Sequence, residues 1–276
     1  MRIVITGSSS GIGHIVTQQL LQDGHDIWGV ARRRQSRPSC DSNLKGTFCS
    51  SVADVSNANS LLTTASHVEK DWTSIDALIA CAAIQGPIGP ATELDPTQWS
   101  ETIRTVLDGT FNAIKAFFPL LERSAQRAKI ICFSGGGATS PRPNFSAYAA
   151  AKAGVVRLVE TLAGEWRDLP LDINAVAPGA LPTAMTAKIL SAGPKVSGPQ
   201  EHASAQHISK LGSEVFEPIC GLVRYLLSDR SDGISGKLIS AQWDDWPNLQ
   251  LHKEDLNRSD VFTLRRIAPK DRGLNW

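Results

Sequence analysis

Residues 2–13, RIVITGSSSGIG, join a short apolar run to a turn rich in glycine and serine. Ile3–Thr6 has the composition of a buried strand, and a helix is expected to open at the end of the turn. Glycines let the backbone approach a pyrophosphate closely, and a helix N-terminus presents unpaired N–H groups. A turn without a ligand is the alternative, but its place between strand and helix favours nucleotide binding. The predicted contacts are Gly7, Ser9, Ser10, Gly11, Ile12 and Gly13.

The rest of the chain alternates short strands with amphipathic helices. Apolar residues recur every three or four positions in residues 146–168, and a further helix is expected at Glu214–Leu227. Repeated strand–helix–strand units predict an α/β fold with a doubly wound parallel sheet. The predicted strands are Ile3–Thr6, Asp26–Ala31, Thr47–Val52, Ala77–Cys81, Lys129–Ser134, Asp172–Ala177 and Lys237–Ala241.

Composition limits the size and the partners of the protein. The 276 residues, 42% hydrophobic and 20% charged, suit one large domain or two small ones. Lysine and arginine total 28 against 27 aspartates and glutamates, so we expect no nucleic-acid or membrane partner. The five cysteines include no CxxC pair, which predicts free thiols and no metal site. Without a signal peptide or an apolar span, a cytoplasmic location is expected.

Two segments lie outside the alternating pattern. Thr183–Ser213 is rich in glycine and proline and predicts a long flexible substrate loop with one short helix. We expect one domain over residues 1–241 and a tail over 242–276, acting as an oligomer or active-site clasp. Substrate contact by the carboxylates near Trp243 and Trp246 is the alternative for the tail. His202 and His207 are candidate substrate contacts, with solvated loop histidines as the alternative.

The end of the second strand predicts which nucleotide binds. Arginines follow Ala31 directly and no carboxylate is present, so a ribose 2′-phosphate is favoured over a free 2′-hydroxyl. We therefore expect NADP(H), held by Arg32 and Arg33, with a solvated basic loop as the alternative. Asp54 and Val55 follow the third strand, where an aspartate can accept a hydrogen bond from the adenine amino group.

Tyr148 and Lys152 are four residues apart at the start of a helix and share a face. A free tyrosine has a pKa near 10, and lowering it by about three units takes about 4 kcal/mol. One ammonium about 4 Å away supplies about that much at an effective dielectric constant of about 20. The pair therefore has the chemistry of an acid/base phenol, with a surface pair as the alternative.

Four motifs give the chain a family resemblance: TGSSSGIG at residues 6–13, YAAAK at 148–152, NAVAPGALPT at 174–183 and EPICGLVRYLLSDRSDGISGKLIS at 217–240. Over about residues 2–241 the chain resembles the short-chain dehydrogenase/reductase family. The resemblance implies a Rossmann-type sheet in the order 3-2-1-4-5-6-7 and a homodimer or homotetramer. It implies that Tyr148 is the general acid/base and that Lys152 lowers its pKa and holds the ribose. The implied cofactor contacts further along the chain are Ala82, Pro178, Gly179 and Thr183.

Three positions depart from the family pattern. Ala80-Cys81-Ala82-Ala83 stands where the family often has Asn-Asn-Ala-Gly. Val106 occupies the place of the proton-relay asparagine, in an apolar stripe that includes Phe111. The catalytic serine of the family would fall at Gly135, thirteen residues before Tyr148, so we predict a one-residue shift and assign its role to Ser134. The alternatives for that role are Thr139, Ser140 and Ser146.

These expectations converge on an NADP(H)-dependent oxidoreductase that transfers hydride between the nicotinamide and a ketone or secondary alcohol. The small-molecule substrate itself is not specified by the sequence. One alternative is an NADP(H)-binding sensor or partner subunit with weakened catalysis. Another is an epimerase or dehydratase that recycles its bound cofactor.

Overall fold

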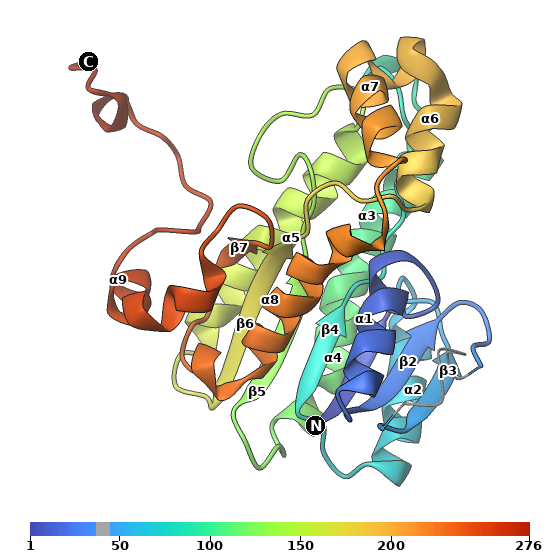
Figure 1. Ribbon diagram of the computed structural model, residues 1–276, viewed down its shortest axis with the longest axis vertical. Helices are drawn as coiled ribbons and strands as arrows, with labels where there is room; N and C mark the ends of the chain where they lie inside the picture. Colours follow the sequence, from blue (N-terminus) through green and yellow to red (C-terminus); the bar gives the residue numbers. More distant parts are fainter. Residues whose placement is uncertain (37–44) are drawn as a thin grey trace.

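A parallel sheet lies at the centre of the computed structural model, which describes residues 1–36 and 45–276 (Figure 1). Within this part of the chain the sheet has seven strands in the predicted order, β3-β2-β1-β4-β5-β6-β7. Each predicted strand is confirmed to within one residue at either end. The strands are β1 (Arg2–Thr6), β2 (Asp26–Ala31), β3 (Phe48–Val52), β4 (Ala77–Ala80), β5 (Ala128–Phe133), β6 (Leu171–Ala177) and β7 (Leu238–Ser240).

Helices cover both faces of the sheet. On one face α1 (Gly11–Gln22) and α8 (Glu217–Leu227) share an apolar core with Ile3 and Ile5 of β1. On the other face Val4 packs in a second core with residues of three further helices. Successive strand residues point to opposite faces, so covering both faces requires strands that are apolar throughout. The helices of the second face are α2 (Ala58–Asp71), α4 (Gly109–Leu121) and α5 (Ser146–Glu165).

The segment that carries Val106 is a π-helical turn, η2 (Arg104–Asp108), between α3 (Pro96–Ile103) and α4. The Val106 side chain is fully buried, as its place in an apolar stripe predicts. The prediction that Phe111 belongs to this buried stripe was wrong. Its side chain is 44% exposed, because it lies on the outer side of α4. Because valine has no polar side-chain atom, Val106 cannot serve as a proton relay.

The predicted flexible excursion is instead a pair of helices, α6 (Ala184–Ser197) and α7 (Pro199–Ile208). The prediction was wrong because glycine–proline pairs were interpreted as loop signals. Gly193 and Gly198 have positive φ angles of 74° and 92° and interrupt the helices, whereas the prolines that follow them begin helical segments. An apolar cluster of Phe145, Ile189 and Ala205 connects the pair to the start of α5.

The first part of the tail packs on the domain, and its last part does not. The Trp246 indole donates to the Ala241 carbonyl at 3.1 Å, and Leu238 of the edge strand β7 donates to the Phe262 carbonyl at 2.8 Å. The tail includes a 3₁₀ segment at Trp246–His252 and helix α9 (Lys253–Arg258). Leu264 still donates to Glu160 of α5 at 2.6 Å, and beyond it the chain extends away from the body of the molecule (Figure 1). Within the described residues, no helix has the length and apolarity needed to span a bilayer.

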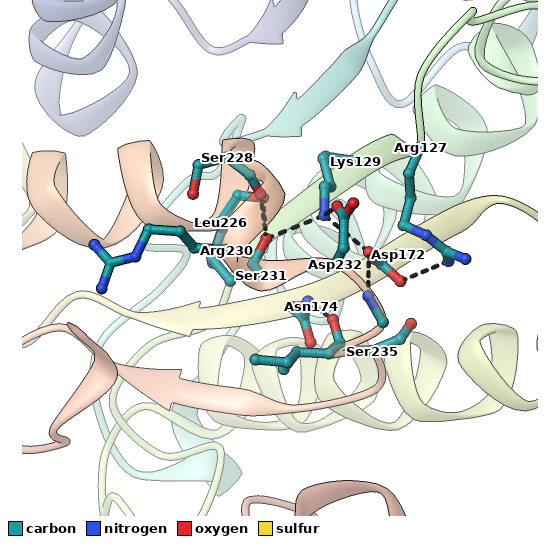
Figure 2. A network of polar contacts seen from close by, with 12 residues as sticks. Arg127, Lys129, Asp172, Asn174, Leu226, Ser228, Arg230, Ser231, Asp232 and Ser235 are labelled. Carbon is teal, nitrogen blue, oxygen red and sulfur yellow. Dashed lines mark hydrogen bonds and ion pairs between the residues drawn. The ribbon is translucent and has the colours of Figure 1, made fainter. Parts of the chain in front are cut away.

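A buried polar network joins the amino ends of β5 and β6 to the turn before β7 (Figure 2). Lys129 Nζ donates to Asp172 Oδ2 at 2.8 Å, Asp232 Oδ1 at 2.7 Å and Ser231 Oγ at 3.1 Å. Asp172 also accepts from Arg127 and from the backbone N–H of residue 233. We call this group the amino-end network. Its charges are paired, so it fixes the end of the sheet that lies away from the predicted site.

Candidate active site

The turn after β1 forms the backbone cradle that the sequence predicts. Gly7 has φ = 73°, and a Cβ added to it would lie 2.7 Å from the Ala82 Cα. A Cβ added to Gly13 would lie 2.4 Å from the Gly7 carbonyl oxygen. Both positions therefore exclude every residue except glycine. The Thr6 hydroxyl fixes the neighbouring strand end by accepting from the Cys81 and Ala82 backbone N–H groups at 3.2 and 3.3 Å.

Helix α1 begins at this turn without a side-chain cap. Ser10 is the N-cap residue, its hydroxyl makes no capping bond, and the first turn holds no acidic residue. The first N–H groups of a helix have no partner within the helix, which leaves them for an anionic ligand. The Thr183 methyl group lies 3.9 Å from the place a Cβ of Gly11 would take. The predicted turn and Thr183 are thus brought together.

The predicted adenosine end lies at the carboxyl ends of β2 and β3. Arg32 and Arg33 are exposed directly after β2. Asp54 Oδ1 accepts from the backbone N–H and the hydroxyl of Ser56 at 2.9 and 2.7 Å, and Val55 is buried. Arg37, the next arginine along the chain after Arg34, lies outside the described residues. Arg32 and Arg33 therefore form an exposed basic edge beside the glycine turn.

Tyr148 and Lys152 lie on the buried side of α5, as their spacing predicts. They are 8% and 3% exposed, and the Lys152 Nζ is 5.7 Å from the centre of the Tyr148 ring. Lys152 donates to the Phe133 carbonyl, at the carboxyl end of β5, at 2.6 Å. A Cβ added to Gly135 would lie 2.7 Å from the Tyr148 Oη. The phenol therefore faces the loop that follows β5.

Burial sets the acidity of this pair in the chain without its nucleotide. It raises the pKa of Tyr148 to about 12 and lowers the pKa of Lys152 to about 8. The lowering of the Tyr148 pKa by Lys152 stays a prediction. Desolvation outweighs the nearby charges, among which Arg142 acts to lower the Tyr148 pKa. The phenol is consequently protonated at neutral pH and is equipped to act as an acid.

Ser134 is not hydrogen-bonded to the phenol. It is 3% exposed, and its Oγ has no hydrogen-bond partner in the part of the chain that the structure describes. Gly135 already faces Tyr148, so the expected shift of register is not needed. Among the alternatives, Ser146 accepts from the Trp99 indole at 3.1 Å, and the other two are exposed. The role of Ser134 stays a prediction that this geometry does not favour.

The end of β6 meets the start of α6 and the start of the tail. Pro178 is buried and Gly179 exposed, and a Cβ on Gly179 would lie 2.5 Å from the Gln242 side chain. This places the predicted nicotinamide contacts beside the α6–α7 pair. Of the two candidate histidines, His207 is exposed, whereas His202 has a buried Nδ1 without a partner among the described residues.

Sequence reasoning missed one pair of charged residues at this site. Arg142, in the β5–α5 loop, makes two hydrogen bonds of 2.8 Å to Glu201 of α7. The two residues are 59 positions apart, so no local pattern could show the pairing. The only available signal was an arginine between two prolines, at positions 141 and 143, shortly before α5.

Comparison with known proteins agrees with this geometry. Residues 1–193 match the family model of short chain dehydrogenases, and the chain belongs to this family. It is 29% identical over 251 residues to a probable 2,4-dienoyl-CoA reductase of Bacillus subtilis, covering 89% of this chain and 96% of the relative. It is 27% identical over 240 residues to the 3-oxoacyl-[acyl-carrier-protein] reductase of Staphylococcus aureus, covering 86% and 94%.

A solved structure shows the same fold. A short chain dehydrogenase of Shigella flexneri, crystallised with NADP, superposes with a TM-score of 0.74 at 23% identity. The match covers 87% of this chain and 97% of the other. The chain is therefore an oxidoreductase of the short-chain dehydrogenase/reductase family, whose members use nicotinamide cofactors.

Proposed function

We propose that this chain is an NADP(H)-dependent reductase of ketones, or the corresponding dehydrogenase of secondary alcohols. One observation carries the proposal: a buried phenol and a buried amine lie on successive turns of α5, at the carboxyl end of β5. Ligands of open α/β sheets bind at the carboxyl ends of the strands. Nucleotide binding alone requires no buried Tyr148, whereas proton transfer to a substrate oxygen does.

The residues of the site fit a dinucleotide. Gly7 and Gly13 form a cradle that any Cβ would fill, and the uncapped start of α1 offers N–H donors to a pyrophosphate. Thr183 borders the same turn. Arg32 and Arg33 would hold a 2′-phosphate, which supports NADP(H) over NAD(H). When bound, the reduced nucleotide supplies the hydride.

The proton chemistry belongs to the chain itself. In reduction, the Tyr148 phenol donates its proton to the oxygen of the ketone as the carbonyl carbon gains a hydride, and a secondary alcohol results. The Lys152 ammonium lies where it can stabilise the phenolate that remains. Because burial raises the pKa of Tyr148 to about 12, the phenol of the free protein is in its proton-donating form at neutral pH.

A second candidate is an NADP(H)-binding sensor or partner subunit. It is favoured by the glycine at position 135, which faces the phenol without a side-chain donor, by the lack of a hydrogen bond between Ser134 and the phenol, and by the buried Val106. The buried Tyr148–Lys152 pair favours the enzyme, because binding a nucleotide requires no proton donor.

Turnover of NADPH with a panel of aldehydes and ketones separates the two candidates. An enzyme consumes NADPH at a rate that depends on the carbonyl compound. Binding of NADPH without consumption for any compound would support the sensor and refute the reductase. Sedimentation of the full chain tests the expected homodimer or homotetramer.

A further inference from the structure

The β5–α5 loop places an arginine beside the glycine that faces the phenol. Residues 135–137 are all glycine, and the first of them faces the Tyr148 Oη. A Cβ added to the next, Gly136, would lie 3.5 Å from the Arg142 Nη1. Gly136 is exposed, so this part of the loop is open to a ligand. The phenol and the guanidinium therefore border consecutive residues of one open loop.

Three contacts fix the guanidinium of Arg142. Its Nε and Nη2 donate to the two carboxylate oxygens of Glu201, both at 2.8 Å. Its centre lies 4.0 Å from the centre of the Phe145 ring, a cation–π contact. The Arg142 side chain is 16% exposed, so it is held in place but still reached by solvent. A bidentate ion pair of this kind fixes the plane of the guanidinium and therefore the direction of its remaining nitrogen, Nη1.

The remaining nitrogen, Nη1, is the one that lies against Gly136. No hydrogen-bond partner for it is found within residues 1–36 and 45–276. The Arg142 charge also acts to lower the pKa of Tyr148, whose other influential neighbour is Cys81, at the end of β4. Lys152, from the same helix, is the second cation near the ring. A charged donor without a partner among the described residues thus borders Gly136, the residue next to the glycine that faces the phenol.

We propose that Arg142 is a catalytic residue: its Nη1 donates a hydrogen bond to the substrate oxygen, at the face where Gly135 provides no side-chain donor. Glu201 is the positioning residue that holds the guanidinium there from α7. The inference rests on the proposed reductase function. It also links the α6–α7 pair to catalysis, because the donor is correctly placed only while α7 lies against the loop.

The activity test compares Arg142→Ala with a matched surface control. Arg123→Ala removes an arginine whose partner, Glu69, is also exposed. Arg142→Ala should lower kcat by about 100-fold, as loss of one donor to a developing oxyanion does. Added guanidinium should restore part of the rate. Glu201→Gln should lower kcat by about tenfold, because it weakens the grip but keeps one acceptor. Arg123→Ala should match the wild type.

A second readout does not depend on turnover. In a Tyr225→Phe background Tyr148 is the only tyrosine of the chain. A stopped-flow jump to a fixed alkaline pH then reports the tyrosinate absorbance of Tyr148 before the protein unfolds. Arg142→Gln should reduce that absorbance, because a cation beside the phenolate is lost. Arg123→Gln should leave it unchanged.

The outcomes separate the inference from the function on which it rests. If the wild type consumes no carbonyl compound, the proposed function fails, and the tyrosinate signal still tests the placement of Arg142. If the wild type is active and Arg142→Ala behaves as Arg123→Ala, the inference is overturned and the function stands. Loss of activity without rescue by guanidinium, together with an unchanged tyrosinate signal, shows a purely structural ion pair and also overturns it.

Discussion

The two ends of β5 and β6 each hold a buried lysine, and the two lysines differ in their partners. Lys129 and Lys152 are both 3% exposed. Lys129, at the amino ends, is paired with two carboxylates and a serine (Figure 2). Lys152, at the carboxyl ends, has the Phe133 carbonyl as its hydrogen-bond partner, and in the described residues no carboxylate bonds to it. A buried charge with paired counter-charges is compensated within the chain, whereas a buried charge without a counter-charge is costly unless a ligand supplies one.

The largest effect is expected at the carboxyl ends. Tyr148→Phe removes the only proposed proton donor and should lower kcat by about 10²- to 10⁴-fold, the usual contribution of general acid catalysis. Steady-state rates with NADPH and the preferred carbonyl compound measure it. Tyr225→Phe is the matched control, because Tyr225 lies on α8 and its hydroxyl contacts the backbone of Arg230, at 3.4 Å, and of Gln250. Equal rates for both variants would remove Tyr148 from the mechanism.

At the amino ends the effect should be on stability alone. Asp172→Asn weakens one of the two charged partners of the buried Lys129, while Asp232 remains, and should lower the free energy of unfolding by about 3 kcal/mol. Urea unfolding measures the loss, and Glu69→Gln, at an exposed ion pair, should cost about 1 kcal/mol or less. The rate per folded molecule should not change. A catalytic defect in folded Asp172→Asn would show that the two ends are not independent.

The buried Lys152 should also make the stability of the protein depend on pH. Burial lowers the pKa of Lys152 from 10.5 to about 8, so between these values the unfolded chain binds more protons than the folded one. Wild-type stability should therefore rise with pH in this window. Lys152→Met should be more stable than wild type at pH 7, by up to about 3 kcal/mol, and the advantage should shrink towards pH 10. Unfolding free energies across this range check it, and a constant difference would contradict it.

The smallest effect concerns the choice of nucleotide. Arg32→Ala and Arg33→Ala should each weaken NADPH binding by about tenfold or more, since a charge-assisted hydrogen bond to the 2′-phosphate is lost. NADH binding should change little, because NADH lacks that phosphate. Fluorescence titration of both nucleotides measures the ratio. Equal losses of affinity for NADPH and NADH would show that these arginines do not bind the 2′-phosphate.

The comparison also shows what the sequence could predict. Strands were located to within one residue, because buried parallel strands are continuous apolar runs with clear ends. The turn at residues 6–13 and the Tyr148–Lys152 pair depend on local spacing, and the structure places them as predicted. Long-range features were not predictable. The Arg142–Glu201 pair depends on how α7 lies against a distant loop, and the acidity of Tyr148 depends on burial that no spacing reveals. The α6–α7 pair was missed because glycine and proline were interpreted as loop residues.

The central claim is that a hydride and the Tyr148 proton are added to one carbonyl group. NADPH carrying deuterium at the transferable position of C4 tests it most directly, with mass spectrometry of the product alcohol. The account predicts one deuterium on the carbinol carbon with the wild-type protein and at most a trace with Tyr148→Phe over the same period. Unlabelled product, or equal labelling by both proteins, would contradict it.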